Sequence, residues 1–300
     1  MPSKLFLFRF CSRQFHLISF LFFIAFSSIL SGCQINRNQS TKKSTSIDKQ
    51  ITISGSTTIL PLSEHWAMEF RKKTGTIVNV QGGGSTNGIV SVKNQTVDIG
   101  ASSRNLSESE KEGVKIIEIG LDALAVVVNP KNKISNLSTK QLGQIFSGQI
   151  KNWKELGGDD RAIQVINREA GSGTRSTFED LIMCANKNTD KNNGKCYEMH
   201  LSAIVLNSNS EVKHSIELIE DSIGYISYGF LDQKVKALSL NSISPGEEAI
   251  RSGNYPISRS LYYIVREGNE SVSTAQYLQF VLSSEAQQML SSEGFLPGQN

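Results

Sequence analysis

The segment REAGSGTRSTFED, residues 168–180, carries one arginine followed by glycine, serine and threonine ahead of an expected helix. The first N–H groups of a helix have no partner inside the helix, and the helix dipole leaves partial positive charge there. Gly171 and Gly173 allow the backbone to approach a ligand closely, and the planar guanidinium of Arg168 suits oxyanions. The segment therefore predicts an anion site, with an ordinary Ser/Thr-capped helix as the alternative.

Three more donor-rich turns follow expected strands. They are SGSTTILP at residues 54–61, QGGGSTNGI at residues 81–89 and DIGASSRNL at residues 98–106. In α/β sheets, ligands bind where the carboxyl ends of strands open into helices, so turns from distant parts of the chain can face one crevice. Each turn taken alone also fits a structural cap, but four together favour a binding site.

Other chemistries fit these turns poorly. The loop GGGSTNG lacks the Lys-Ser/Thr pair of a Walker motif and does not have the dinucleotide-binding spacing. Ser172 lies in Gly-Ser-Gly, without the outer glycines of a nucleophile elbow. The histidines His65, His200 and His214 have no visible triad context. The pattern therefore indicates binding rather than catalysis.

The elements that must hold these turns alternate between short β-like runs and amphipathic segments. The run at 51–55 precedes an expected helix at 61–75, where Pro61 suits the first turn and Gly75 the end. The alternation continues to a long C-terminal helix expected from about residue 273 to 292. This order predicts an α/β fold, and 300 residues with 38% hydrophobic content suffice for two packed domains.

The N-terminal segment predicts export. Lys4, Arg9 and Arg13 precede a run at residues 15–33 that has no acidic residue and is short for a membrane span. Its end, Leu-Ser-Gly-Cys at residues 30–33, resembles the bacterial lipobox, in which the cysteine is lipidated and becomes the new N-terminus. We predict a signal peptide over residues 1–32, lipidation of Cys33 and a flexible tether over residues 33–50. An uncleaved anchor is the alternative.

Removal of the signal peptide changes the charge of the chain. Residues 1–32 hold three basic residues and no acidic residue, so a formal charge of +3 becomes 0 in the mature chain. This balance provides no electrostatic case for binding nucleic acid. Any anion site must therefore be local.

Two cysteines remain once Cys11 in the signal and Cys33 in the lipobox are set aside. Cys184 and Cys196 flank the polar stretch ANKNTDKNNGK, and a disulfide between them is the expected state in an oxidising compartment. A zinc site that recruits His200 is a weaker alternative, because two cysteines and one histidine are a poor ligand set.

In this order, the four motifs resemble those of the phosphate-binding lipoproteins of bacterial high-affinity phosphate (Pst-type) ABC importers. The resemblance covers nearly the whole chain after the tether. It implies a two-lobed periplasmic-binding-protein fold of type II, with the ligand in the cleft between the lobes. Lobe one would comprise residues 51–126 and 225–300, and lobe two residues 127–224.

The resemblance also assigns a binding site. The implied phosphate-binding residues are Ser56, Thr57, Thr58, Ser85, Ser103, Arg168, Ser172, Gly173 and Thr174, with Arg168 as the cation. Longer members of the family have an aspartate, which accepts the proton of hydrogen phosphate, where this chain has Ser103. Asp122 is a candidate substitute, and a solvent-facing hinge carboxylate is the alternative role for it.

The implied function is that of an extracytoplasmic, lipid-anchored and monomeric receptor. It would capture inorganic phosphate and deliver it to the permease and ATPase subunits of an ABC importer, without a cofactor, a metal or enzymatic activity. A receptor for sulfate or another tetrahedral oxyanion is the alternative. An exported phosphate-ester hydrolase is less favoured, because it needs a metal cluster or an activated nucleophile.

Overall fold

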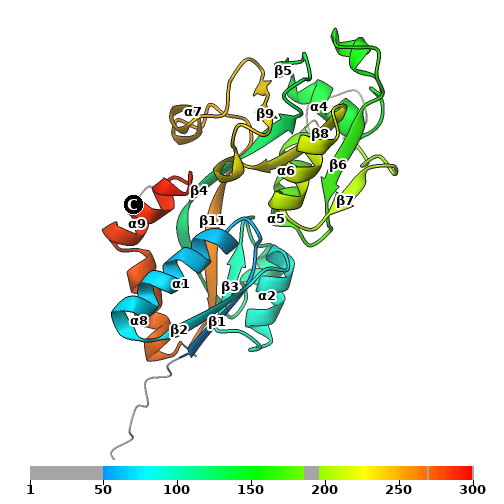
Figure 1. Ribbon diagram of the computed structural model, residues 1–300. Helices are drawn as coiled ribbons and strands as arrows, with labels where there is room; N and C mark the ends of the chain where they lie inside the picture. The colour runs from blue at the N-terminus through cyan, green and yellow to red at the C-terminus, as the bar shows by residue number, and fades with distance from the viewer. Residues whose placement is uncertain (1–49, 186–195, 269, 299–300) are drawn as a thin grey trace, which may run out of the picture. The chain divides into compact units, whose positions relative to one another are not determined.

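The computed structural model describes residues 50–185, 196–268 and 270–298 (Figure 1). The predicted signal peptide, Cys33 and the tether up to residue 49 lie outside the described residues. No helix in the described part of the chain is long and apolar enough to cross a membrane.

A mixed sheet forms the centre of the fold. In the described residues its strands follow the order β2-β1-β3-β11-β4-β8-β6-β7, and β9 pairs with β4. The strands are β1 (Gln50–Gly55), β2 (Ile77–Gln81), β3 (Ile99–Ser102), β4 (Val114–Val128), β6 (Gln164–Arg168), β7 (Ile204–Leu206), β8 (Ser222–Ser227), β9 (Lys236–Ala237) and β11 (Ser258–Arg266). A separate pair consists of β5 (Asn136–Leu137) and β10 (Ser239–Leu240). β1 is parallel to β2 and β3, and β6 is parallel to β7 and β8, so several strands end at the same edge.

The predicted alternation of strands and helices is present along most of the chain. The helices are α1 (Leu60–Thr74), α2 (Ser85–Lys93), α3 (Glu108–Lys111), α4 (Thr139–Phe146), α5 (Gly173–Phe178), α6 (Asn209–Leu218), α7 (Glu247–Arg251), α8 (Val272–Val281) and α9 (Ser284–Ser292). Short 3-10 helices, η1 (Trp153–Leu156) and η4 (Tyr228–Phe230), and the π-helical turn η2 (Glu179–Met183) complete the set. α1 begins with Pro61 in its first turn and ends at Gly75 with φ of 75°, as its sequence predicts.

The prediction of a single C-terminal helix from residue 273 to 292 is wrong. The segment forms α8 and α9, which are separated at Leu282 and Ser283. The Ser283 side chain accepts a hydrogen bond from the backbone N–H of Ala286 and so caps a new helix. The apolar pattern continues across the break, so it does not indicate where the first helix ends.

Two hydrophobic clusters form the cores of the two lobes. One contains Ile53, Trp66 and Tyr263, and the other contains Val126 and Phe146. β4 contributes to both, because its first half packs in one cluster and the continuous apolar run at residues 123–128 is buried in the second lobe. β4 therefore carries the chain from the first lobe to the second.

The position where the chain returns to the first lobe follows from the same clusters. Leu238, Ile250 and Ile257 pack in the second core, whereas Leu261 packs in the first. We propose that the second lobe extends to about residue 257 and that the chain returns along β11, rather than near residue 225.

The predicted disulfide is confirmed, because Cys184 and Cys196 are bonded to each other. The zinc alternative at these residues is wrong, since disulfide sulfurs are no longer thiolate ligands. Among the residues that the structure describes, no three His, Cys, Asp or Glu side chains gather in a way that could hold a metal ion.

Candidate functional site

The four donor-rich turns meet at the carboxyl ends of β1, β2, β3 and β6. Backbone hydrogen bonds join them: Ser56 N donates to Ala101 O at 2.9 Å, and Gly84 N donates to Gly55 O at 2.9 Å. Across the lobes, Thr86 N donates to the carbonyl of Gly171 at 3.2 Å. The expectation that these turns share one region is therefore confirmed.

Three serine hydroxyls from the first lobe form a buried cluster, which we call the serine cluster: Ser56, Ser85 and Ser103. The Ser56 hydroxyl donates to Ser103 Oγ at 2.8 Å, and Ser103 N donates to Ser85 Oγ at 3.0 Å. A Cβ at Gly173 would lie 2.3 Å from Ser85 Oγ and 2.7 Å from Ser103 Oγ. Only glycine allows the amino end of α5 to pack this closely against the serine cluster.

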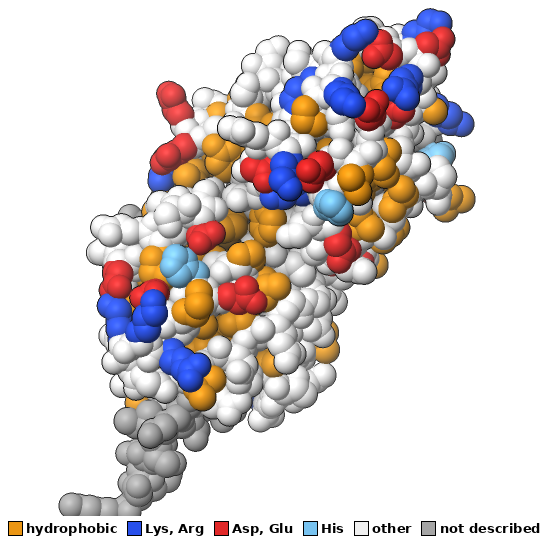
Figure 2. All heavy atoms as spheres, viewed as in Figure 1, with side chains coloured by type: hydrophobic (Ala, Val, Ile, Leu, Met, Phe, Trp, Pro, Cys, Tyr) orange, Lys and Arg blue, Asp and Glu red, His pale blue; other side chains and the backbone are white. Residues whose placement is uncertain are grey.

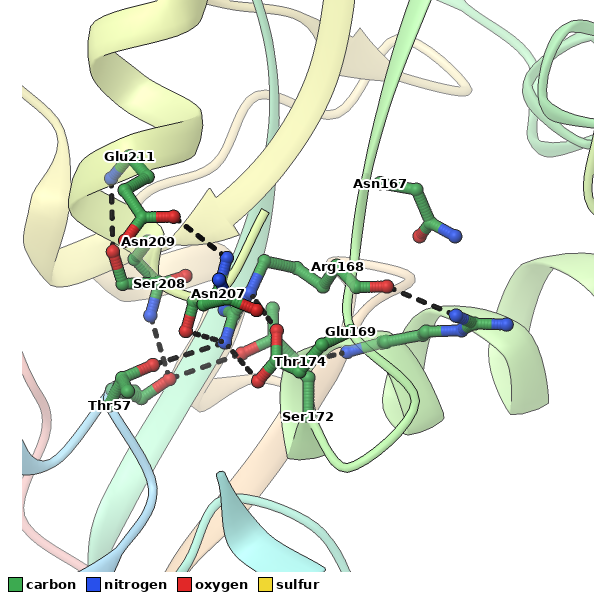
Figure 3. Close-up of polar contacts among 12 residues, drawn as sticks. Thr57, Asn167, Arg168, Glu169, Ser172, Thr174, Asn207, Ser208, Asn209 and Glu211 are labelled. Atoms are coloured by element: carbon green, nitrogen blue, oxygen red, sulfur yellow. Dashed lines mark hydrogen bonds and ion pairs between the residues drawn. The ribbon is translucent and has the colours of Figure 1, made fainter. Parts of the chain in front are cut away.

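Arg168 ends β6 and is buried at the same site (Figure 3). Its Nε and Nη2 donate to the Glu169 carboxylate at 2.8 and 2.9 Å, and Nη2 also donates to Thr57 Oγ1 at 3.1 Å. The Asn207 carbonyl accepts a further bond from Nη2 at 3.2 Å. The remaining nitrogen, Nη1, is buried without a hydrogen-bond partner among the described residues. A buried N–H without an acceptor is costly, so Nη1 is a donor suited to an anion.

The amino end of α5 contributes residues with different roles. The Ser172 hydroxyl accepts from Arg175 N at 3.2 Å, so it caps the helix as the structural alternative proposed. Thr174 Oγ1 lies 3.1 Å from Thr58 Oγ1 of the first lobe, and both residues are buried. We call the first-lobe side of the site, which includes Thr58, and the α5 side, which includes Thr174, the two walls of the site. They meet through these two hydroxyl groups.

A second buried arginine, which the sequence analysis missed, lies beside these hydroxyls. Arg259 on β11 faces Asp122 on β4, and its Nε and Nη2 donate to Asp122 Oδ2 at 3.0 and 2.7 Å. Its Nη1 donates to Ser103 O at 3.1 Å and to Thr174 Oγ1 at 3.0 Å, while Nη2 donates to Thr58 Oγ1 at 3.1 Å. No motif surrounds Arg259, and its only sequence signal is a charge near the start of an apolar strand.

Asp122 is completely buried, so the solvent-facing alternative for it is wrong. Burial raises the pKa of its carboxyl group, and the adjacent guanidinium of Arg259 opposes that rise. Its hydrogen bonds run to Arg259 and to the hydroxyl of Ser227, which donates at 2.9 Å, rather than to the serine cluster. Asp122 is therefore the ion-pair partner of Arg259. Contact of Asp122 with a bound anion stays a prediction.

Asn209, the first residue of α6, is a further contact that the sequence analysis missed. Its Nδ2 donates to Thr58 Oγ1 at 3.0 Å, and its Oδ1 accepts from Ser227 N at 3.1 Å. In Figure 3 the labelled side chains of Thr57, Arg168, Thr174 and Asn209 lie close together, where β6 ends and α5 and α6 begin. No residue pattern marks this asparagine as part of a site.

Charged side chains of both signs are mixed on the face of the molecule that Figure 2 shows. On the face shown in Figure 2, lysine and arginine side chains lie beside aspartate and glutamate rather than in a continuous basic patch. Ion pairs of the described residues include Lys154–Asp160 at 2.8 Å and Lys213–Asp232 at 2.9 Å. Among the described residues, the two buried arginines beside the donor-rich turns are Arg168 and Arg259.

Comparisons with known proteins agree with this geometry. Residues 40–285 match the model of the PBP superfamily domain. The phosphate-binding protein PstS of Borreliella burgdorferi is 33% identical over 92% of this chain and 96% of that protein. The protein of the same name from Bacillus subtilis is 31% identical over 94% of this chain and 93% of its own.

Solved structures give the same result. A Clostridium perfringens protein with bound phosphate is 30% identical, with a TM-score of 0.77 over 83% of this chain and all of that one. A phosphate transport receptor of ABC type from Vibrio cholerae is 35% identical, with a TM-score of 0.69 and the same coverage. The chain thus has the two-lobed periplasmic-binding-protein fold, and it belongs to the PBP superfamily and, within it, to the family of phosphate-binding proteins named PstS.

Proposed function

We propose that this protein binds inorganic phosphate outside the cytoplasm and delivers it to an ABC importer. The names of its relatives and the phosphate bound in the Clostridium perfringens structure support this function. The observation that carries the proposal is the buried Nη1 of Arg168, which has no acceptor among the described residues, while Nη2 of the same guanidinium donates to the hydroxyl of Thr57.

The proposed ligand contacts come from both lobes. Arg168 would supply the charge-assisted bond, and the amino end of α5 at Gly173 and Thr174 would supply a backbone and a hydroxyl donor. Ser56, Ser85 and Ser103 would bind from the first lobe. Thr57 and Thr58 complete the first loop, and Ser172 acts mainly as the cap that holds α5 in place.

A site built this way binds through hydrogen bonds more than through net charge. Each buried arginine already has a carboxylate partner, since Arg168 pairs with Glu169 and Arg259 pairs with Asp122. Such pairing keeps the apo site near neutrality, and the bound anion relies on oriented donors in a low dielectric.

Isothermal titration of the unlipidated mature chain with phosphate, sulfate and arsenate tests the proposal. We expect phosphate to bind most tightly and arsenate, which has the same shape and protonation, to compete with it. A phosphatase assay in parallel should give no turnover. Tight sulfate binding with weak phosphate binding would support the other receptor class, and turnover would support the hydrolase.

The lipid anchor is a separate part of the proposal, supported by the Leu-Ser-Gly-Cys sequence that ends at Cys33. An anchor would hold the receptor near its permease and raise its local concentration there. A Cys33→Ser protein should leave the membrane fraction. Continued fractionation with membranes, as for the wild type, would contradict the anchor without affecting the phosphate proposal.

A further inference from the structure

Four buried polar side chains connect the two walls of the site: Thr58, Thr174, Asn209 and Arg259. Arg259 donates one bond to each threonine hydroxyl, through Nη2 to Thr58 at 3.1 Å and through Nη1 to Thr174 at 3.0 Å. Asn209 donates a second bond to Thr58 at 3.0 Å. The two hydroxyl oxygens lie 3.1 Å apart, so they also bond to each other.

The direction of each bond follows from the donors and acceptors available. A guanidinium carries only donors, so Arg259 cannot accept from either threonine. The amide of Asn209 is oriented by Ser227, whose backbone N–H must meet the amide oxygen at 3.1 Å. The amide nitrogen therefore faces Thr58, and it too can only donate.

These directions determine the positions of the hydroxyl protons. A hydroxyl has one proton and two lone pairs, and both lone pairs of Thr58 are occupied by Arg259 and Asn209. Thr58 must then donate its own proton to Thr174. Both lone pairs of Thr174 are thereby filled, by Thr58 and Arg259, and the proton of Thr174 is left for an acceptor outside the four residues.

We infer that Arg259 and Asn209 are positioning residues that make this wall of the site donate one hydroxyl proton, through Thr174, and accept none. The inference rests on the proposed function and deepens it, because it states which oxygens of the anion this wall can bind. An unprotonated oxygen of the anion can accept the hydroxyl proton of Thr174. The P–OH group of hydrogen phosphate, in contrast, finds no acceptor for its own proton at this wall.

The serine cluster differs in this respect. Ser103 Oγ accepts from Ser56 at 2.8 Å, and either hydroxyl can donate in its contact with Ser85 Oγ at 3.4 Å, so Ser103 has a second lone pair open whenever it donates to Ser85. The proton of hydrogen phosphate must therefore be accepted outside the threonine wall, and the serine cluster offers a hydroxyl oxygen that can do so. Selectivity against sulfate then depends on acceptors outside the threonine wall, because Thr174 can donate to an oxygen of either anion.

The substitution Asn209→Asp tests this by changing one donor into an acceptor. A carboxylate still accepts from Ser227 N, but its other oxygen now takes the proton of Thr58. Thr174 must then donate to Thr58, which leaves a lone pair of Thr174 facing outward. We expect the ratio of the sulfate Kd to the phosphate Kd to rise at least about tenfold, because only hydrogen phosphate can donate a proton to that lone pair.

The measurement is a pair of titrations at pH 8, where hydrogen phosphate and sulfate are both dianions. The added charge then repels both anions about equally and largely cancels in the ratio. Ser210→Asp is the matched control, since it adds the same charge one residue later in α6 on an exposed side chain. Its ratio should stay within about twofold of the wild type.

Thr58→Val provides a neutral second variant and decides the matter if Asn209→Asp does not fold. It removes the donor that fills Thr174, so the ratio should rise in the same direction by about threefold or more. Equal loss of affinity for both anions in the folded variants, with an unchanged ratio, would mean that the network is only structural and would overturn the inference. Absence of phosphate binding in the wild type would instead refute the proposed function itself.

Discussion

Arg168 and Arg259 are both buried, and each pairs with one carboxylate, yet their remaining donors differ. Arg168 pairs with its neighbour in sequence, Glu169, and keeps Nη1 without a partner among the described residues. All three nitrogens of Arg259 donate to protein atoms, and its carboxylate lies 137 residues away. The two arginines are alike in residue type and burial and differ in the number of unused donors, which supports the proposed role of Arg168 in binding and of Arg259 in organising the site.

The location of the partner explains the difference. The carboxylate of the adjacent residue bonds Nε and Nη2 of Arg168, and Nη1 has no hydrogen-bond partner among the described residues. Asp122 and Arg259 face each other on neighbouring strands that pass between the lobes, and their pair is buried on every side. We therefore expect Arg259 to affect stability most and Arg168 to affect binding most.

The largest effect should come from Arg259→Met. This variant leaves the carboxylate of Asp122 buried without its cation, which typically costs about 3–5 kcal/mol in the free energy of unfolding. Urea denaturation of the wild type and the variant measures this loss. The double variant Arg259→Met/Asp122→Leu should recover much of it, because no buried charge remains. A loss of less than about 1 kcal/mol in the single variant would contradict the expectation that Arg259 affects stability more than Arg168 does.

Arg168→Ala should have the opposite profile. Charge-assisted hydrogen bonds contribute about 1.5–3 kcal/mol each, so phosphate affinity should fall at least about tenfold while the fold stays intact. Isothermal titration and a urea melt on the same sample check both halves. Arg161→Ala is the matched control, because Arg161 pairs with Glu220 and Asp221 at the surface, and its affinity should be that of the wild type. Unchanged titration of Arg168→Ala would remove this arginine from the site.

Ser103→Asp should change selectivity rather than overall affinity. A carboxylate facing the anion accepts the proton of hydrogen phosphate but leaves sulfate opposite a second negative charge. The preference for phosphate over sulfate should therefore sharpen by about tenfold or less in competition titrations. An unchanged preference would mean that Ser103 does not face the ligand.

Asp122→Asn separates the two possible roles of this carboxylate. If Asp122 serves Arg259 alone, the variant loses stability and the phosphate-to-sulfate preference stays the same. If its carboxylate also reaches the anion, the preference should relax, because an amide can donate to either anion. The contacts of Asp122 with Arg259 and Ser227 favour the first result.

The smallest effect concerns a third arginine at the edge of the site. Arg104 donates to both oxygens of Glu110 at 2.8 Å, and these bonds lower the pKa of Glu110 to about 2. A lowered carboxyl pKa stabilises the fold above the unfolded value of about 4.5, and this contribution is lost as the pH falls toward about 2. Because the pair is partly exposed, we expect only about 1 kcal/mol.

Glu110→Gln measures this contribution. The variant should be less stable than the wild type at pH 7, and the difference in unfolding free energy should shrink between about pH 4.5 and pH 2. A difference that stays constant across this range would show that the pairing with Arg104 does not control the titration. A smaller loss than that of Arg259→Met would show that this partly exposed pair contributes less than the buried pair of Arg259.

Much of the site was already determined by local sequence. The glycines of the four turns, the cap at Ser172 and the helix bounded by Pro61 and Gly75 act through backbone conformations and hydrogen bonds over a few residues. Arg168 was found because it lies inside one of these turns. The pairing of Cys184 with Cys196 followed because no other cysteine remained after Cys11 and Cys33.

Only the tertiary structure decided which donors remain for a ligand. The pairing of Arg259 with Asp122, and the contacts of Asn209 with Thr58 and Ser227, join residues from separate strands and helices. No spacing along the chain predicts them, because hydrogen-bond satisfaction depends on every group packed around an atom. The unpaired Nη1 of Arg168 and the filled lone pairs of Thr58 are properties of that packing, and the sequence alone contains no local signal for either.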